Sequence, residues 1–325
     1  MATPGDLTPS QSLEAQARRT RLTLFGLLFL CSSVPLFFPV LSKFVPNTPV
    51  DQSIDLYATL MRVPENSTIL VQTDWTNSTR GESGGEFESI MRILMRKHCK
   101  LAIFSNGDPN APRVAMDDLE LLNADLKAAG QPEYKHWTDY VSMGFFPNAE
   151  GANNAEAANL RAAWAGKKDV DLQGAATDVF KSPVLENVHS IKDSPLIVII
   201  TASNTFNVLV ERLSDKMPVV AAVTGVMGPE SQVYYASKQI KGLATGVKGV
   251  YDLESLMETG INWKGPDGKI GFEIPDRPTV PGWPGQKNYD RGQRYFPTLI
   301  LDLTLLILAV VAGNIGMLLA KKRSA

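Results

Sequence analysis

The chain has few of the residues that form disulfides or metal sites, with only two cysteines and three histidines among 325 residues. Cys31 lies inside an apolar segment and Cys99 follows a predicted helix, so the two do not suit a disulfide. The histidines, His98, His136 and His189, show no metal-ligand spacing with them. We therefore expect no metal, no cofactor and a fold held together by core packing alone.

The chain also lacks a strong charge of either sign and the short motifs of common enzymes. Its 32 basic and 34 acidic residues give a net charge of −2, and a protein without a basic field is not expected to bind nucleic acid. There is no G-x-S-x-G, H-E-x-x-H, G-x-x-x-x-G-K or G-x-G-x-x-G pattern. The sequence argues against an enzyme but leaves one open, because catalytic groups can assemble from distant positions.

Two long apolar segments, residues 22–42 and 299–320, lie near the two ends of the chain. Each has about the 20 residues that a helix needs to cross ~30 Å of hydrocarbon. Arginines precede the first segment, and lysines and an arginine follow the second. Because cationic flanks stay on the cytoplasmic side, we expect two spans, both termini in the cytoplasm and the central domain across the membrane.

The first apolar segment has an alternative interpretation as a cleaved signal peptide, because its flank is basic. However, the segment is long for a signal sequence, Pro35 and Pro39 interrupt it, and residues 43–46 make a poor cleavage site. We favour a retained, kinked span that packs against a partner helix.

The second span carries polar and small residues that indicate helix pairing. Asp302 lies about one turn inside the span, so it either sits at the headgroup boundary or pairs with Arg294 or another helix. Small residues at four-residue spacing let helix backbones approach closely, and an amide can hydrogen-bond across the contact. The predicted interface residues are Ala309, Ala312, Gly313, Asn314 and Gly316. The first span, a second copy of the chain and other membrane proteins are the candidate partners, besides the lipid bilayer itself.

These features divide the chain into seven parts. They are a cytoplasmic tail (1–21), a first span (22–42), a connector (43–67), an α/β domain (68–262), a hairpin with a proline-rich juxtamembrane connector (263–298), a second span (299–320) and a cytoplasmic tail (321–325).

The central domain reads as alternating strands and helices. Apolar runs predict strands over 69–73, 100–104, 140–146, 196–200 and 218–223. Helical periodicity is clearest over 87–98, and further helices are expected over 112–129, 154–165, 205–215 and 230–240, with a short one over 175–180. This order predicts a doubly wound, mostly parallel α/β sheet of about five strands, flavodoxin- or Rossmann-like.

The end of the domain differs in composition. Residues 265–268 form a turn signal between short extended pieces, which predicts a small hairpin, and four prolines then make a stiff connector. Aromatic and cationic residues follow, among them Trp283, Tyr289 and Arg291. We expect these residues at the lipid headgroup layer, because such side chains favour the membrane surface.

A ligand site in an open parallel sheet lies beyond the carboxyl ends of its strands. Polar residues follow all five predicted strands, and the loop at 74–85, after the first of them, has donors and glycines before a helix, as an anion cradle requires. The candidate ligand-binding residues are Asp74, Thr76, Arg80, Glu82, Ser105, Asn106, Ser203 and Asn204. A solvated polar loop is the alternative. No catalytic residue is assigned.

Three stretches resemble a family of uncharacterised bacterial membrane proteins that carry an extracytoplasmic α/β domain between two terminal spans. The first is the strand at 69–74 with Gly81, Glu82 and the helix ending at 94–98; the others are 140–147 and 218–225 continuing to 241–246. The resemblance implies a bacterial inner, or plasma, membrane location and the same architecture. It implies no activity and no catalytic residue.

Three functions fit these observations. The first is a membrane-anchored structural or interaction subunit of a larger assembly, and it agrees best with the features of the spans. The second is an extracytoplasmic sensor or binding protein for a small anion. The third is a membrane-tethered hydrolase or transferase that would depend on one of the histidines.

Overall fold

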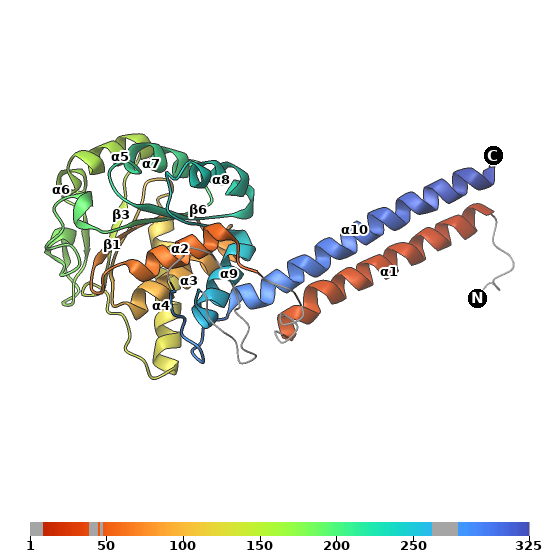
Figure 1. Ribbon diagram of the computed structural model, residues 1–325, viewed down its shortest axis with the longest axis horizontal. Helices are drawn as coiled ribbons and strands as arrows, with labels where there is room; N and C mark the ends of the chain where they lie inside the picture. The colour runs from red at the N-terminus through yellow and green to blue at the C-terminus, as the bar shows by residue number, and fades with distance from the viewer. Residues whose placement is uncertain (1–8, 39–44, 46–47, 262–278, 325) are drawn as a thin grey trace. The chain divides into compact units, whose positions relative to one another are not determined.

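The structure, a computed structural model, describes residues 9–38, 45, 48–261 and 279–324 (Figure 1). The chain divides into two compact units. One contains residues 1–46 and 293–325, and the other contains residues 47–292. The predicted hairpin at 265–268 lies outside the described residues.

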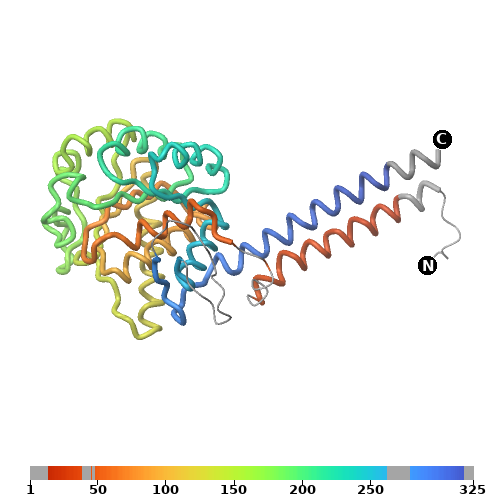
Figure 2. Tube along the Cα trace, viewed as in Figure 1, coloured from red at the N-terminus to blue at the C-terminus, as the bar shows by residue number. Residues whose placement is uncertain are grey.

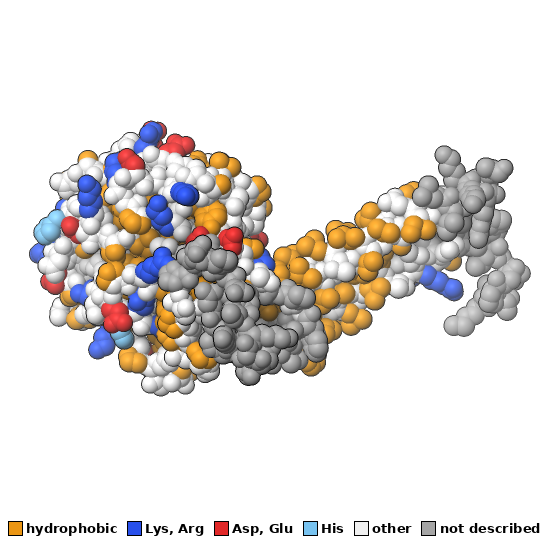
Figure 3. Space-filling view, in the orientation of Figure 1, with side chains coloured by type: hydrophobic (Ala, Val, Ile, Leu, Met, Phe, Trp, Pro, Cys, Tyr) orange, Lys and Arg blue, Asp and Glu red, His pale blue; other side chains and the backbone are white. Residues whose placement is uncertain are grey.

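The first unit consists of two long helices, α1 (Pro9–Phe37) and α10 (Arg291–Ser324), which run antiparallel side by side (Figure 2). The stretches Glu14–Phe37 and Arg291–Met317 are long and apolar enough to cross a membrane. Apolar side chains cover much of the surface that Figure 3 shows for this unit. The Ser32 hydroxyl donates to both carboxylate oxygens of Asp302, at 3.0 and 2.9 Å. Asp302 thus has a partner on the other helix.

The second unit is built on a six-stranded parallel sheet, one strand more than the sequence predicts. The strands, in the order β3-β2-β1-β6-β7-β8, are β3 (Tyr140–Phe145), β2 (Lys100–Ser105), β1 (Thr68–Asp74), β6 (Ile197–Thr201), β7 (Val219–Val223) and β8 (Leu243–Thr245). All neighbouring pairs are parallel. The chain moves outward from β1 to one edge and returns to build the other half from β6, which is the strand order of a Rossmann fold.

Helices cover both faces of the sheet (Figure 1). One face carries α2 (Asp51–Arg62), α3 (Arg80–Arg96), α4 (Ala111–Ala128) and α9 (Gly246–Thr259). The other carries α5 (Ala149–Ala158), α6 (Leu160–Ala163), α7 (Thr205–Leu213) and α8 (Gly228–Ala236). Each face has its own apolar core, and the central strands are buried on both sides, as their unbroken apolar sequences require.

A small antiparallel hairpin, β4 (Lys168–Val170) with β5 (Ala176–Asp178), occupies the region where the sequence predicted a short helix. The predicted helix is confirmed only at its end, where a short 3-10 helix covers Val179–Lys181, whereas residues 176–178 form a strand. The Asp171 carboxylate accepts hydrogen bonds from the backbone N–H groups of Gln173 and Ala175, at 2.9 Å each. Gly174 takes a positive φ of 79° in the turn, which closes a hairpin instead of continuing a helix.

Residues 279–292, which we call the strap, lie against the second unit. Val280 pairs with Ile261, and the Trp283 N–H donates to the Met257 carbonyl at 2.5 Å. The Trp283 ring packs edge-on against Tyr57 on α2, and the Arg96 guanidinium lies 4.9 Å from its centre. The sequence predicted an extended, proline-rich connector whose aromatic and cationic residues lie at the lipid headgroup layer. In the structure, the aromatic and cationic residues of the strap contact the domain.

Candidate functional site

The strand order reverses between β1 and β6, so the crevice expected for a ligand lies beyond the ends of these two strands. Asp74 is the last residue of β1 and is 3% exposed. Ser105 is the last residue of the neighbouring strand β2, and Asn106 directly follows it. Thr201 is the last residue of β6. The structure therefore brings three of the eight predicted residues, Asp74, Ser105 and Asn106, to one point.

At that point the Asp74 carboxylate is saturated with hydrogen bonds. Oδ1 accepts from the Ser105 hydroxyl at 2.6 Å and from the N–H groups of Asn106 and Gly107 at 3.1 and 3.0 Å. Oδ2 accepts from the Gln72 amide at 2.6 Å and the Thr205 hydroxyl at 2.7 Å. These bonds leave Asp74 no free lone pair for a ligand. Its carboxylate instead joins the loops after β1, β2 and β6.

The network continues into the core through residues that sequence reasoning missed. The Asn106 amide donates to Asn153 Oδ1 at 3.1 Å and to Glu156 Oε1 at 3.2 Å, both on α5. The Trp164 indole N–H donates to the same Glu156 oxygen at 3.1 Å. Burial raises the pKa of Glu156 to about 8, although both hydrogen bonds oppose the shift. A buried glutamate of this kind is a neutral member of the network at pH 7.

The other five predicted residues have different partners. Thr76 bonds to Ser78 at the surface, and Arg80 pairs with Asp118 on α4. The Glu82 carboxylate accepts the Gly225 N–H at 2.7 Å, at the end of β7. The Ser203 hydroxyl oxygen accepts the Thr205 N–H at 3.4 Å. Asn204 is the N-cap residue of α7, but its side chain makes no capping hydrogen bond. These five residues form no common site among the described residues.

The loop before α3 offers little room for the predicted anion cradle. The Thr79 carbonyl accepts the N–H groups of Glu82 and Ser83 at 3.1 and 3.0 Å, as in an ordinary first helical turn. The Thr79 N–H in turn donates to the Thr76 carbonyl at 3.0 Å. Donors used in this way are not directed at a ligand. One turn further along α3, burial and then the charge of Glu82 raise the pKa of the fully buried Glu86 well above its ordinary value.

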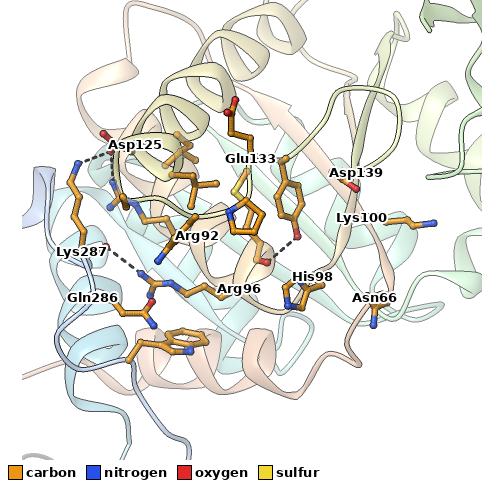
Figure 4. A pocket seen from close by; sticks show the side chains of 18 residues that line it. Asn66, Arg92, Arg96, His98, Lys100, Asp125, Glu133, Asp139, Gln286 and Lys287 are labelled. Atoms are coloured by element: carbon orange, nitrogen blue, oxygen red, sulfur yellow. Dashed lines mark hydrogen bonds and ion pairs between the residues drawn. The ribbon is translucent and has the colours of Figure 1, made fainter. Parts of the chain in front are cut away.

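A cavity lies at the opposite end of the sheet, beside the amino ends of β2 and β3 (Figure 4). It has a volume of about 580 Å³, within the usual range of ligand pockets. Its walls are the last turns of α3 and α4, the loop after α4, and the strap. Met95, Leu122, Leu126, Tyr134 and Trp283 give it an apolar lining.

Charged side chains surround this apolar lining. Asp125 is already paired with Lys287 at 2.6 Å and with Arg92 at 3.6 Å, and Glu133 is paired with Lys127 at 3.4 Å. Arg96 donates only to neutral acceptors, the Asn288 amide oxygen at 2.5 Å, the Lys287 carbonyl at 3.3 Å and the Met257 sulfur at 3.7 Å. The pocket therefore contains a guanidinium whose direct hydrogen bonds reach no carboxylate, although the charge of Glu258 acts on it from further away.

The three histidines lie apart and provide no shared catalytic centre among the described residues. His98 lines the pocket and has a positive φ of 55° just after α3. His136 contacts Asp169 at 2.8 Å, and His189 contributes its N–H to Asp193. Across the described ranges, no group of three or more metal-ligating side chains is present.

In the span α10, the predicted interface residues have little contact with α1. Ala309 is half-buried, whereas Ala312 and Asn314 are exposed. No described heavy atom lies within 4 Å of the position that a Cβ would take at Gly313 or Gly316. The contact between the two helices instead includes Ser32 and Asp302, nearer the start of the span.

Comparisons of the chain with protein-family models, with curated proteins and with solved structures find no match. The strand order alone does not establish a nucleotide site, because Rossmann-like folds serve many functions.

Proposed function

We propose that the chain is a two-span membrane protein that presents its α/β domain outside the cytoplasm as an interaction subunit of a larger membrane assembly. Both termini lie in the cytoplasm of a bacterial cell in this proposal. Cationic residues at the outer ends of the apolar segments 22–42 and 299–320 support the orientation, and the Ser32–Asp302 bond supports retention of α1 as the partner of α10.

The observation that carries the proposal is the exposed amide of Asn314. It lies in the apolar part of α10, and the structure gives its side chain no hydrogen bond among the described residues. An amide left unpaired in hydrocarbon costs several kcal/mol, roughly, on a cyclohexane scale. A second helix that contacts the small residues around Asn314 would supply the missing partner.

Exposed apolar residues on the domain agree with an interaction subunit. Val226 is 90% exposed and Val233 is 66% exposed. Pro229 and Ala236 are exposed on the same stretch, at helical spacing. This stripe lies on the turn after β7 and on α8, so it belongs to the domain and not to the spans.

The proposal predicts that Asn314→Leu weakens association in the membrane. An interhelical hydrogen bond of about 0.6–2 kcal/mol corresponds to a loss of about threefold to thirtyfold in the association constant. The measurement is the fraction of the chain that purifies with partner proteins, or as a dimer, after mild detergent extraction. Thr304→Leu is the matched control, because the Thr304 hydroxyl already donates to the Ile300 carbonyl at 2.7 Å. Recovery of the wild-type chain as a lone species would contradict the proposal.

A second function, ligand sensing, is favoured by the pocket at the amino ends of β2 and β3. Part of its wall is the strap, and the strap continues directly into α10. A ligand there would contact the segment that enters the second span.

A further inference from the structure

We propose that the pocket between α3, α4 and the strap binds a small ligand that carries one anionic group, a carboxylate or a phosphate, on an apolar body. This site lies at the end of the sheet opposite the crevice predicted from the sequence. The inference is independent of the proposed assembly role, since it concerns residues 66–139 and 283–287 alone.

The apolar body is inferred from the lining. Met95, Leu122 and Leu126 come from the inner sides of α3 and α4, and the rings of Tyr134 and Trp283 complete the walls. The Tyr134 hydroxyl is held by the carbonyls of Met95 and Cys99, both at 3.0 Å, so its ring is fixed in place. A cavity of about 580 Å³ with such walls accommodates a ring system.

The anionic group is inferred from the balance of charges. The carboxylates of Asp125 and Glu133 have cationic partners, and Asp139 accepts the Lys135 N–H at 2.8 Å. Arg96, in contrast, has only neutral acceptors and stacks on Trp283. Burial first and then the charge of Arg92 lower the pKa of Arg96 to about 10, while Tyr57 and Glu258 act in the opposite direction.

Arg92 adds a second positive charge beside Arg96, although its own amino groups are not open to the cavity. Its side chain is 8% exposed, and both of its carboxylate contacts, Asp290 at 3.2 Å and Asp125 at 3.6 Å, use Nη2. The other amino group, Nη1, is buried without a hydrogen-bond partner among the described residues. Arg92 and Arg96 lie four residues apart on α3, so they share one side of the helix (Figure 4). The partly exposed Arg96 guanidinium, with the charge of Arg92 beside it, suits carboxylate or phosphate oxygens.

The test uses the full chain in a non-ionic detergent and titrates 2-naphthoate against its neutral isostere 2-naphthamide by calorimetry. We expect saturable binding of the anion at least tenfold tighter than that of the amide. Arg96→Gln should lower the affinity for naphthoate at least tenfold. Arg161→Gln is the matched control and should change nothing: Arg161 also lies over a ring, Phe180, at 5.1 Å and donates to carbonyls, but it does not line the pocket.

A second variant, Gln286→Trp, keeps the test valid if Arg96→Gln fails to fold. Gln286 is exposed at the mouth of the pocket, so the larger ring should block entry without disturbing the core. Equal binding of naphthoate and naphthamide, or wild-type affinity in both pocket variants, would overturn the proposal.

Two further probes identify the source of the anion. Stronger binding of 2-naphthyl phosphate than of dihexanoyl phosphatidate would support a soluble metabolite, and the reverse order would support a membrane lipid. If Arg96→Gln weakens neither probe, the assignment of the anion to Arg96 is wrong.

Discussion

At the scale of single residues, the carboxyl edge of the sheet is organised by Asp74, which was a predicted ligand-binding residue. Its oxygens accept five hydrogen bonds, from Gln72 within β1 and from residues that follow β2 and β6, and a Cβ at Gly107 would lie 2.9 Å from the Asp74 carboxyl carbon. Only glycine permits this approach. An aspartate so fully engaged stabilises the loops, and its removal would expose several unsatisfied donors. The structure thus favours a structural role for this residue.

Glu156 gives the residue-scale prediction. Its folded-state pKa of about 8 lies above its ordinary value of 4.5, so the folded protein binds more protons than the unfolded protein between these pH values. The stability that neutral Glu156 contributes is complete below pH 4.5 and is lost as the pH rises toward 8. The loss amounts to at most about 1.4 kcal/mol per pH unit.

Glu156→Gln should remove this slope, because the amide keeps the acceptor for Asn106 and Trp164 and does not titrate. Urea unfolding of the full chain at pH 5, 6.5 and 8 measures the effect through tryptophan fluorescence, as all five tryptophans lie in the domain unit. The variant should gain stability relative to the wild type as the pH rises. Glu133→Gln, at an exposed site, is the control. Parallel slopes in the wild type and Glu156→Gln would refute the interpretation.

The residue scale also marks a limit of sequence reasoning. The rule for strand ends placed Asp74, Ser105 and Asn106 together, because parallel strands end at one edge. This rule missed Gln72 and Glu156, because Gln72 lies inside a strand and Glu156 lies on an alanine-rich helix. A signal was present: Asn153 and Glu156 are three residues apart on α5, which places both polar side chains on one face, and that face is buried.

At the scale of elements, ion pairs and hydrogen bonds hold the end of the strap to α3 and α9 of the domain. Arg291 bonds to Glu88 on α3 at 2.8 Å and to the Arg80 carbonyl at 2.7 Å. The backbone N–H groups of Asp290 and Gly292 donate to Glu254 on α9, at 3.2 and 3.1 Å. Burial raises the pKa of Glu88 to about 7, whereas Arg291 and Arg92 lower it. The pair is therefore fully charged only above neutral pH.

Arg291→Ala tests the attachment of the strap. The substitution leaves Glu88 buried without its closest cation, which costs roughly 2–3 kcal/mol when the carboxylate is charged. The loss should be larger at pH 8 than at pH 5.5, because the raised pKa keeps Glu88 neutral in acid. Denaturation at the two pH values measures it, and adding Glu88→Gln should restore most of the loss at pH 8. A loss that is independent of pH, or no rescue, would contradict the role of this pair.

The elements that the sequence predicted well have strong local signals. The unbroken apolar runs of β6 and β7 and the periodic face of α3 are visible without any tertiary information. The three-residue strand β8 was missed because it is too short for a pattern, and it forms only beside β7. The strap was assigned to the membrane surface because Trp283 and Arg291 suit either a headgroup layer or a protein surface. Composition does not distinguish these two environments.

At the scale of the whole molecule, the two-span topology predicts which residues are accessible from outside the cell. The domain should be outside and the chain before the apolar segment at 22–42 inside, since cationic residues flank both apolar segments on their outer sides. Lys192→Cys places a thiol at an exposed position of the domain, and Gln16→Cys places one at an exposed position of α1 before this apolar segment. The native thiols are a weak background, because Cys99 is buried and Cys31 lies within the first candidate span.

A membrane-impermeant maleimide should label Lys192→Cys in intact spheroplasts and Gln16→Cys only after permeabilisation. The mass of the purified chain provides the second readout. Retention of α1 requires that residue 16 remain in the mature protein, together with the Ser32–Asp302 bond between the helices. A chain that begins after α1 would indicate a cleaved signal sequence and would leave Asp302 without Ser32. Labelling of Gln16→Cys in intact spheroplasts would reverse the orientation, and with it the compartment in which the domain and its pocket meet their partners.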